Sequence, residues 1–341
     1  MTDCICREPP RRLRLAVNIM ANASQIESVS AFDVAAAAAR IAGRVRSTPV
    51  FRLAPGDLVP ATGVVLKLEC LQHTGSFKAR GAFNAMLASP VPPAGVVTAS
   101  GGNHGAAVAF AASQLGHRAE IFAAATAPAA KIDRIRGYGG HVFRRGSAYS
   151  QAMEACLERA LATGARLIHA YDQPETVAGQ GTTFREFEEQ APEVDVVLVA
   201  VGGGGLLAGA LAWYDRRIKV VGVEPESAPT LARALAAGSP VDVEVAGIAV
   251  DSLGARRIGA IAFALARERL HASVLVTDEA IRQSQALLWD QLRIMAEAGG
   301  ATALAALVSG RWRPAPGQRV GVLVCGANLD LSLAPGRNPQ S

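Results

Sequence analysis

The chain has 341 residues, half of them hydrophobic and 18% charged, with a formal net charge of +5. A typical domain has about 150 residues, so this length predicts about two domains with enough apolar material for their cores. The positive surplus is small and partly local, because Arg7, Arg11, Arg12 and Arg14 lie near the N-terminus. No basic stripe with interleaved aromatic residues is present, so nucleic-acid binding is not expected.

The ends of the chain and its cysteines say little about chemistry. Residues 11–23 loosely imitate a secretory signal, but Asn18 breaks a short apolar stretch, so residues 1–25 are predicted to be a disordered tail. Translation starting at Met20 instead of Met1 is the alternative. Residues 333–341 are predicted to be a C-terminal tail.

The chain has five cysteines, and their spacing is not that of a zinc site. They are therefore predicted to be free thiols in a reducing cytoplasm.

From residue 31 onward, the pattern predicts alternating helices and strands. Ser30 is the expected N-cap of the first helix, with Asp33 in its first turn. The predicted helices are 31–45, 78–87, 102–115, 128–136, 149–162, 174–189, 206–213, 279–296 and 301–307. The predicted strands are 64–71, 96–98, 120–123, 141–144, 166–169, 196–201, 219–223 and 319–324. This alternation predicts an α/β fold with parallel sheets, in two units near residues 90–170 and 170–330.

Three glycine-bearing turns follow predicted strands, at 100–105, 202–205 and 325–328. Ligands of open parallel sheets bind at the carboxyl ends of strands, where such turns lie. The second turn has four consecutive glycines, Gly202, Gly203, Gly204 and Gly205, and opens a helix. Its N–H groups favour an anion such as a phosphate, although a tight turn without a ligand is the simpler alternative. The apolar run 196–213 therefore predicts a strand, a loop and a helix, not a membrane span.

Lys78 stands at the start of a predicted helix, within the sequence HTGSFKARG of residues 73–81. Most lysines are solvated surface charges. A cation at a helix N-terminus opposes the helix dipole, and burial there would lower the pKa of Lys78. An amine with a lowered pKa suits covalent attachment of a carbonyl group or a role as general base.

The motifs TGSFKARGAFNAM, SGGNHG, AGQGT, VGGGGLLAG, VEPESAPT and CGANLD occur in this order over about residues 30 to 332. As a set, they resemble the threonine/serine dehydratase group of the tryptophan-synthase-β-like, fold type II pyridoxal-phosphate enzymes. The resemblance implies two three-layer α/β domains, each centred on a parallel sheet, with the cofactor between them. The large cofactor-binding domain would comprise residues 26–88 and 170–332, and the small substrate-binding domain residues 89–169.

The resemblance also implies a role for each matching residue. Lys78 matches the lysine that holds pyridoxal 5'-phosphate covalently and moves the Cα proton. The other implied cofactor contacts are Phe77 and Asn103 at the ring, Gly202, Gly203, Gly204 and Gly205 at the phosphate, and Cys325 at the pyridine nitrogen. Glu297 flanks the ring. The implied substrate loop contains Ser100, Gly101, Asn103 and His104. The implied protein is a cytoplasmic homodimer that converts L-threonine, L-serine or a related 3-hydroxy amino acid into a 2-oxo acid and ammonia.

Three positions depart from the family pattern. Gly101 stands where serine racemases have a serine that transfers a proton, so racemisation is not expected. Glu224 and Ala228 match a divalent-cation site, but Thr230 replaces its aspartate, so no metal ligands are predicted, and a weaker site for a monovalent cation near Glu224 is the alternative. Ala246 replaces a family aspartate. Because few residues follow the last predicted strand, we expect no isoleucine-sensitive regulatory domain.

Two alternatives remain open at this point. The first is another reaction in the same family, that of a threonine synthase or a β-replacement enzyme. Threonine synthases have an aspartate where this chain has Ala79, and cysteine synthases lack the phenylalanine at position 77. The second is a nucleotide-binding α/β protein without pyridoxal phosphate, which would be colourless.

Overall fold

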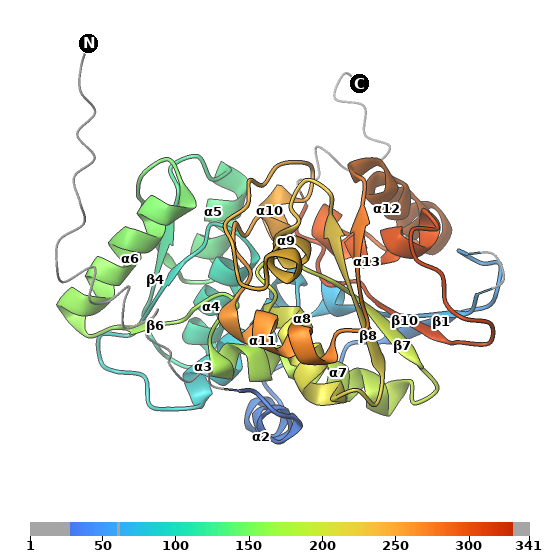
Figure 1. Ribbon diagram of the computed structural model, residues 1–341. Coiled ribbons are helices and arrows are strands. Elements are labelled where there is room, and N and C mark those ends of the chain that lie inside the picture. Colours follow the sequence, from blue (N-terminus) through green and yellow to red (C-terminus); the bar gives the residue numbers. More distant parts are fainter. Residues whose placement is uncertain (1–27, 60–61, 330–341) are drawn as a thin grey trace, which may run out of the picture.

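The computed structural model describes residues 28–59 and 62–329 (Figure 1). The predicted tails at 1–25 and 333–341, and the choice between Met1 and Met20, fall outside the described residues. Within them, strands and helices alternate along the chain and form an α/β fold, as predicted. The three described cysteines, Cys70, Cys156 and Cys325, are free and buried.

The larger sheet has six strands in the order β1-β2-β10-β7-β8-β9. All neighbours from β2 to β9 are parallel. The prediction of parallel sheets is wrong at one edge, where β1 runs antiparallel to β2. The connection 54–63 is too short for the crossover of about a dozen residues that a parallel pair needs. The strands are β1 (Val50–Leu53), β2 (Val64–Lys67), β7 (Val196–Ala200), β8 (Lys219–Pro225), β9 (Ala272–Val276) and β10 (Val320–Leu323).

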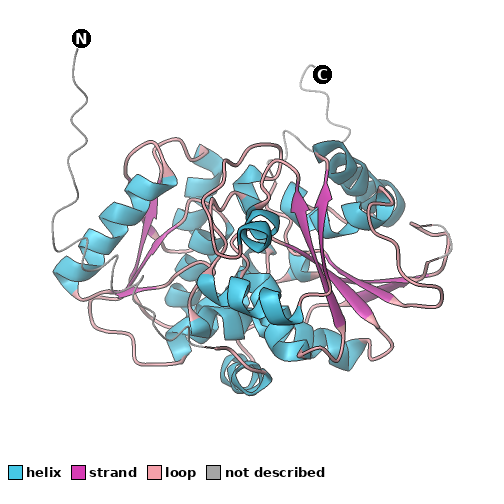
Figure 2. Cartoon of the chain, viewed as in Figure 1, coloured by secondary structure: helices cyan, strands magenta, loops and turns pink. Residues whose placement is uncertain are grey.

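The smaller sheet has four parallel strands in the order β5-β4-β3-β6. Its strands are β3 (Val96–Ala99), β4 (Ala119–Ala123), β5 (His141–Arg144) and β6 (Arg166–Leu167). Figure 2 shows the two groups of strands on opposite sides of the molecule, with helices between them. The chain leaves the larger sheet after β2, builds the smaller sheet, and returns at β7.

Helices cover both faces of each sheet (Figure 1). The larger sheet has α7, α8 and α11 on one side and α12 and α13 on the other, and the smaller sheet lies between α6 and the pair α4 and α5. The helices are α2 (Ala31–Ile41), α3 (Lys78–Leu87), α4 (Asn103–Gln114), α5 (Ala129–Gly137), α6 (Tyr149–Thr163), α7 (Pro174–Gln190), α8 (Gly205–Tyr214), α9 (Thr230–Ala237), α10 (Val250–Leu253), α11 (Ala260–Arg269), α12 (Asp278–Leu292) and α13 (Ala298–Val308), with 3₁₀ turns η1 (Glu69–Leu71) and η2 (His73–Gly75).

Local signals explain where several elements begin and end. Ser30 caps α2 as predicted, since its side chain accepts from the backbone N–H of Asp33. That helix ends at Ile41, not at residue 45, because the chain turns at Gly43 with φ +72°. The predicted strand 64–71 ends at Lys67, because η1 begins at Glu69. The apolar run 196–213 forms β7, a loop and α8, as predicted. No helix in the described part of the chain is long and apolar enough to cross a membrane.

Helix α7 lies between α3 and α8 and approaches both at glycines of the AGQGT motif. A Cβ on Gly179 would lie 2.7 Å from the carbonyl oxygen of Arg80 and from the Cα of Gly81 on α3. A Cβ on Gly181 would lie 3.1 Å from the carbonyl oxygen of Gly209 on α8. These distances are shorter than normal contacts, so the motif allows three helices to pack closely.

We expect Gly179→Ala to lower the free energy of unfolding by about 1–3 kcal/mol, because the added methyl group overlaps the backbone of α3. Gly137→Ala is the matched control. Gly137 is also helical, but no atom lies within 4 Å of its Cβ position. There the usual helix preference should stabilise the protein by up to about 1 kcal/mol. Urea unfolding measures both values. Equal effects at the two sites would contradict the close packing of α7 on α3.

Candidate active site

Lys78 is the first residue of α3 and points toward the segment that follows β6. Its Nζ donates a hydrogen bond to the carbonyl oxygen of Ala170 at 2.8 Å. The Nζ also lies 5.1 Å from the centre of the Phe77 ring. The side chain therefore sits between the start of α3 and residues 168–171, with no carboxylate partner among the described residues.

The chain has four lysines, and the other three are used differently. Lys67 is fully buried and pairs with Glu186 at 2.5 Å. Lys131 pairs with Asp251 at 3.0 Å. Lys219 is exposed at the first position of β8. Lys78 thus differs from the other three lysines, because its ammonium is buried and contacts the neutral Ala170 carbonyl instead of a carboxylate.

The protein surroundings lower the pKa of Lys78 to about 8, because burial of its ammonium outweighs the attraction of the Cys325 thiol group. An ordinary lysine has a pKa of about 10.4. A pKa of about 8 leaves about a tenth of the Lys78 amine neutral at pH 7, a far larger share than in an ordinary lysine.

The four glycines form the loop between β7 and α8. The carbonyl oxygens of Gly202, Gly203 and Gly204 each accept one hydrogen bond. Their donors are the Thr230 hydroxyl at 2.7 Å, the Gly259 N–H at 3.0 Å and the Ala208 N–H at 2.8 Å. The N–H groups of the same three glycines have no acceptor in the described part of the chain. The loop thus presents unused donors at a helix N-terminus, which suits a phosphate.

Tyr171 connects this loop to Lys78. A Cβ on Gly205 would lie 2.8 Å from the Cα of Tyr171, and a Cβ on Gly203 would overlap the Tyr171 ring. Gly204 has φ +88°, a backbone conformation that favours glycine. Because Tyr171 follows the Ala170 carbonyl that Lys78 contacts, the segment 170–171 brings Lys78 and the glycine loop together.

The 100–105 turn leads from β3 into α4 and faces the end of the larger sheet. Asn103 donates to Glu297 at 2.6 Å and accepts from the side chain of Asn328 at 2.8 Å. A small cavity of about 10 Å³ beside Asn103 is lined by Gly102, Ala106, Lys131, Arg134 and Asn328. Asn103 therefore links the smaller sheet to the segments around β10.

Ser100 and His104 flank Asn103 in this turn. The Ser100 hydroxyl accepts from the Gly102 N–H at 3.3 Å. The Nε2 of His104 lies 3.1 Å from the Ile168 carbonyl. Burial, and then the nearby Lys78 charge, lower the pKa of His104 to about 3, so its ring is neutral. His104 therefore holds the turn against residue 168 as a neutral hydrogen-bonding group.

Cys325 lies just after β10, beside the start of α3. Its Sγ donates to the Gly299 carbonyl at 3.4 Å, and its own carbonyl accepts from the Phe77 N–H at 3.2 Å. Burial raises the pKa of the Cys325 thiol, so the thiol stays neutral. Burial also raises the pKa of Glu297 to about 7. The structure thus gathers Phe77, Lys78, Asn103, Glu297 and Cys325 around the start of α3, between the two sheets.

A buried charge network stands on the other side of α3 from this site. Arg80 follows Lys78 by two residues and donates to both oxygens of Glu69, at 2.9 and 2.7 Å. Arg80 also contacts Glu186 at 3.0 Å, and Glu186 in turn pairs with Lys67. The attraction of these carboxylates keeps the pKa of Arg80 high despite its burial. The first turn of α3 is therefore anchored by two acidic residues.

Sequence reasoning overlooked several residues that shape the site. The Ala170 carbonyl is a backbone group, so no residue type could signal it. The sequence signal for Tyr171 was its position just after the predicted strand 166–169, where ligand-binding residues of parallel sheets lie. The Lys131–Asp251 pair joins α5 to α10, an element that the pattern did not predict.

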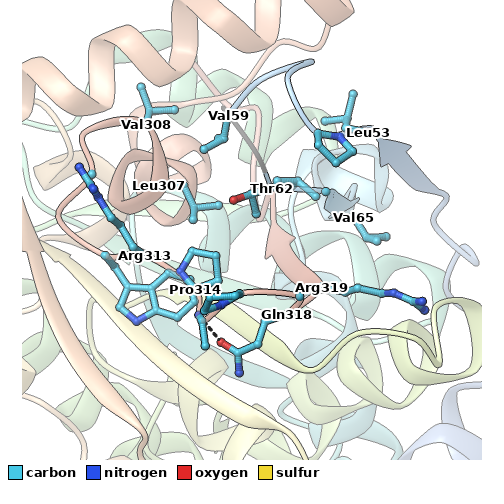
Figure 3. A pocket seen from close by; sticks show the side chains of 18 of the residues that line it. Leu53, Val59, Thr62, Val65, Leu307, Val308, Arg313, Pro314, Gln318 and Arg319 are labelled. Atoms are coloured by element: carbon cyan, nitrogen blue, oxygen red, sulfur yellow. Dashed lines mark hydrogen bonds between the residues drawn. The ribbon is translucent and has the colours of Figure 1, made fainter.

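A cavity of about 1330 Å³ lies elsewhere, between the β1–β2 edge and residues 307–319. Figure 3 shows Leu53, Val65, Leu307, Arg313 and Arg319 around it. None of the residues that line this cavity belongs to the predicted site. The cavity is therefore separate from the cluster around Lys78.

Known proteins agree with this geometry. Residues 41–326 match the family model described as pyridoxal-phosphate dependent enzyme. The chain is 38% identical over 317 residues to a phenylserine dehydratase from Ralstonia pickettii, over 91% of this chain and 97% of the relative. The solved T.th. threonine deaminase is 36% identical with a TM-score of 0.83, over 89% of this chain and 99% of that one.

Maize serine racemase is 32% identical with a TM-score of 0.84, over 89% of this chain and 95% of that one. These relatives are named for different reactions, so the comparison identifies the family and the cofactor and leaves the substrate open. The length of the family match, the identities and the shared fold lead to one conclusion. The chain belongs to the fold type II family of pyridoxal-phosphate-dependent enzymes.

Proposed function

We propose that this enzyme converts L-threonine, L-serine or a related 3-hydroxy amino acid into a 2-oxo acid and ammonia. The observation that carries the proposal is Lys78, whose pKa is lowered to about 8, placed beside a glycine loop with unused N–H donors. The family match removes the nucleotide-binding alternative without pyridoxal phosphate. The names of the phenylserine dehydratase and threonine deaminase relatives support a dehydratase.

In this proposal, Lys78 holds the cofactor covalently through Nζ. Gly202, Gly203, Gly204 and Gly205 bind its phosphate with their N–H groups. Pyridoxal phosphate, when bound, withdraws electrons and makes the Cα–H of an amino acid acidic. Lys78, once released as a neutral amine, takes this proton.

Phe77, Asn103 and Cys325 surround the ring of the cofactor. Asn103, held by Glu297 and Asn328, donates or accepts at the ring oxygen. The neutral thiol of Cys325, which donates to the Gly299 carbonyl in this structure, would turn to donate only a weak hydrogen bond to the pyridine nitrogen. A weak donor at this position limits electron withdrawal and favours prompt loss of the β-hydroxyl over transamination.

Gly101 separates dehydration from racemisation. The loop of Ser100, Gly101, Asn103 and His104 receives the substrate carboxylate, and Gly101 has no side chain to transfer a proton on the opposite face. A Cβ at Gly101 would lie 3.0 Å from the Cβ of Ala127, so even a small side chain would be crowded there. This favours elimination over the reaction named for the serine racemase relatives.

We also propose that the large domain comprises residues 26–88 and 170–332 and the small domain residues 89–169, with the cofactor between them. A cytoplasmic homodimer completes the proposal. The free, buried state of the described cysteines suits a reducing compartment, and two-fold dimers are the commonest oligomers.

A substrate panel tests the proposed reaction. We expect steady release of 2-oxo acid and ammonia in equal amounts from one or more of threonine, serine, 3-hydroxyaspartate and 3-phenylserine. Homoserine phosphate, and O-acetylserine with sulfide, are the comparison substrates for threonine synthase and β-replacement activity. Turnover of these alone would contradict the proposed dehydratase.

We expect Lys78→Ala to abolish 2-oxo acid formation and the visible absorbance of the bound cofactor together, because the covalent link and the base are the same amine. Lys219→Ala, at an exposed lysine, is the matched control and should retain both. Absorbance spectra and coupled ammonia assays measure the two properties. A Lys78→Ala protein that keeps both would show that another residue holds the cofactor.

We expect Gly203→Asp to lose the cofactor, because a carboxylate adds negative charge and bulk where the phosphate binds. Gly137→Asp adds the same charge at a helical glycine with open space around it and should retain the cofactor. The ratio of cofactor to protein after dialysis measures both. Full cofactor content in Gly203→Asp would remove the loop from the site.

A further inference from the structure

Thr230 and Glu224 form a buried pair behind the glycine loop. Both side chains are fully buried, Glu224 near the end of β8 and Thr230 at the start of α9. The Thr230 hydroxyl lies 2.7 Å from the Gly202 carbonyl oxygen and 3.1 Å from a carboxyl oxygen of Glu224. The hydroxyl therefore lies between the loop and the carboxyl group, with the shorter distance to the loop.

Both oxygens of Glu224 are occupied by groups of α9. One accepts from the Leu231 N–H at 2.6 Å and the other from the Ala232 N–H at 2.9 Å. These N–H groups belong to the first turn of α9, where backbone N–H groups have no acceptor within the helix. Glu224 thus fixes the start of α9 to β8, and Thr230 with it.

The contact at Gly202 determines where a neighbouring N–H points. The carbonyl of Gly202 and the N–H of Gly203 share one planar trans peptide, so they point in opposite directions. The hydroxyl of Thr230 holds that carbonyl, and the Gly203 N–H is consequently directed to the other side of the loop. That N–H has no acceptor in residues 28–59 and 62–329.

These residues do not fit a divalent cation. Family resemblance places a cation between the positions of Glu224, Ala228 and Thr230, with an aspartate at the last. A hydroxyl supplies no negative charge, and both Glu224 oxygens already accept from N–H groups. In the described residues, no cluster of three or more histidines, cysteines or carboxylates could hold a metal ion. Divalent cations prefer six or more oxygen ligands, often with several carboxylates.

We infer that Thr230, braced by Glu224, is a positioning residue that aims the Gly203 N–H at the cofactor phosphate, in place of a bound cation. This inference rests on the proposed role of the glycine loop. It adds that the direction of the Gly203 N–H depends on the Thr230 hydroxyl and not on a divalent cation.

The test is cofactor binding by the Thr230→Val holoenzyme. Equilibrium dialysis should show an affinity about tenfold lower than in the parent, since loss of the hydroxyl leaves a buried carbonyl without its donor. The ³¹P resonance of the bound cofactor should shift, because the Gly203 N–H no longer points at the phosphate. Thr230→Ser keeps the hydroxyl and should restore both values.

Ser284→Ala is the matched control. Ser284 is buried in α12, which contributes no residue to the proposed site, and its hydroxyl donates to the Ala280 carbonyl at 2.9 Å. Its loss should lower stability but leave cofactor affinity within twofold and the ³¹P resonance in place. Treating the parent with EDTA, or adding Mg²⁺, should also leave affinity within twofold.

Two results would overturn the inference. One is an unchanged affinity and ³¹P resonance in Thr230→Val. The other is a parent enzyme that loses cofactor in EDTA and regains it with Mg²⁺. If Gly203→Asp loses the cofactor while Thr230→Val does not, only the role of Thr230 fails. If Gly203→Asp also retains it, the proposed phosphate site fails.

Discussion

The close crossing of α7 with α3 and α8 is the constraint on which the site depends. Lys78 opens α3, and the glycine loop opens α8, so the distance between these two helices sets the distance between the Lys78 amine and the glycine loop. Gly179 and Gly181 let α7 touch both neighbours at backbone distance. A side chain at either position would overlap the backbone of a neighbouring helix.

On the opposite side of α3, a buried network also fixes the position of this helix. Its members are Glu69, Arg80, Glu186 and Lys67. Buried ion pairs often add little net stability, because desolvation of the charges offsets their attraction. Their forked hydrogen bonds do fix direction, however. Arg80 donates to four carboxylate oxygens, two of Glu69 and two of Glu186, which fixes the first turn of α3 with Lys78 facing Ala170.

Sequence reasoning succeeded where a local signal dictates structure. Helix α3 begins and ends at the predicted residues, and β7, the glycine loop and α8 follow an unmistakable apolar and glycine pattern. It missed β1 and the elements α9, α10, α11 and β9, for which it predicted neither a helix nor a strand. Two of these, β1 and α10, have four residues each and are too short to carry a periodic pattern. At the site, the residue pattern indicated Lys78, and the family resemblance implied Asn103 and Cys325. The Ala170 carbonyl and the Thr230 contact depend on tertiary structure alone.

The strand order has a consequence for how the chain folds during synthesis. β10 separates β2 from β7, and its Val320 pairs with both Val64 and Val196. The larger sheet therefore cannot be joined until residues 320–323 have been synthesised, whereas all strands of the smaller sheet lie within residues 96–167. Long-range pairing of this kind slows folding, because distant segments must meet before their contacts form. The strand order therefore allows the smaller sheet to pair its strands before the larger sheet can do so.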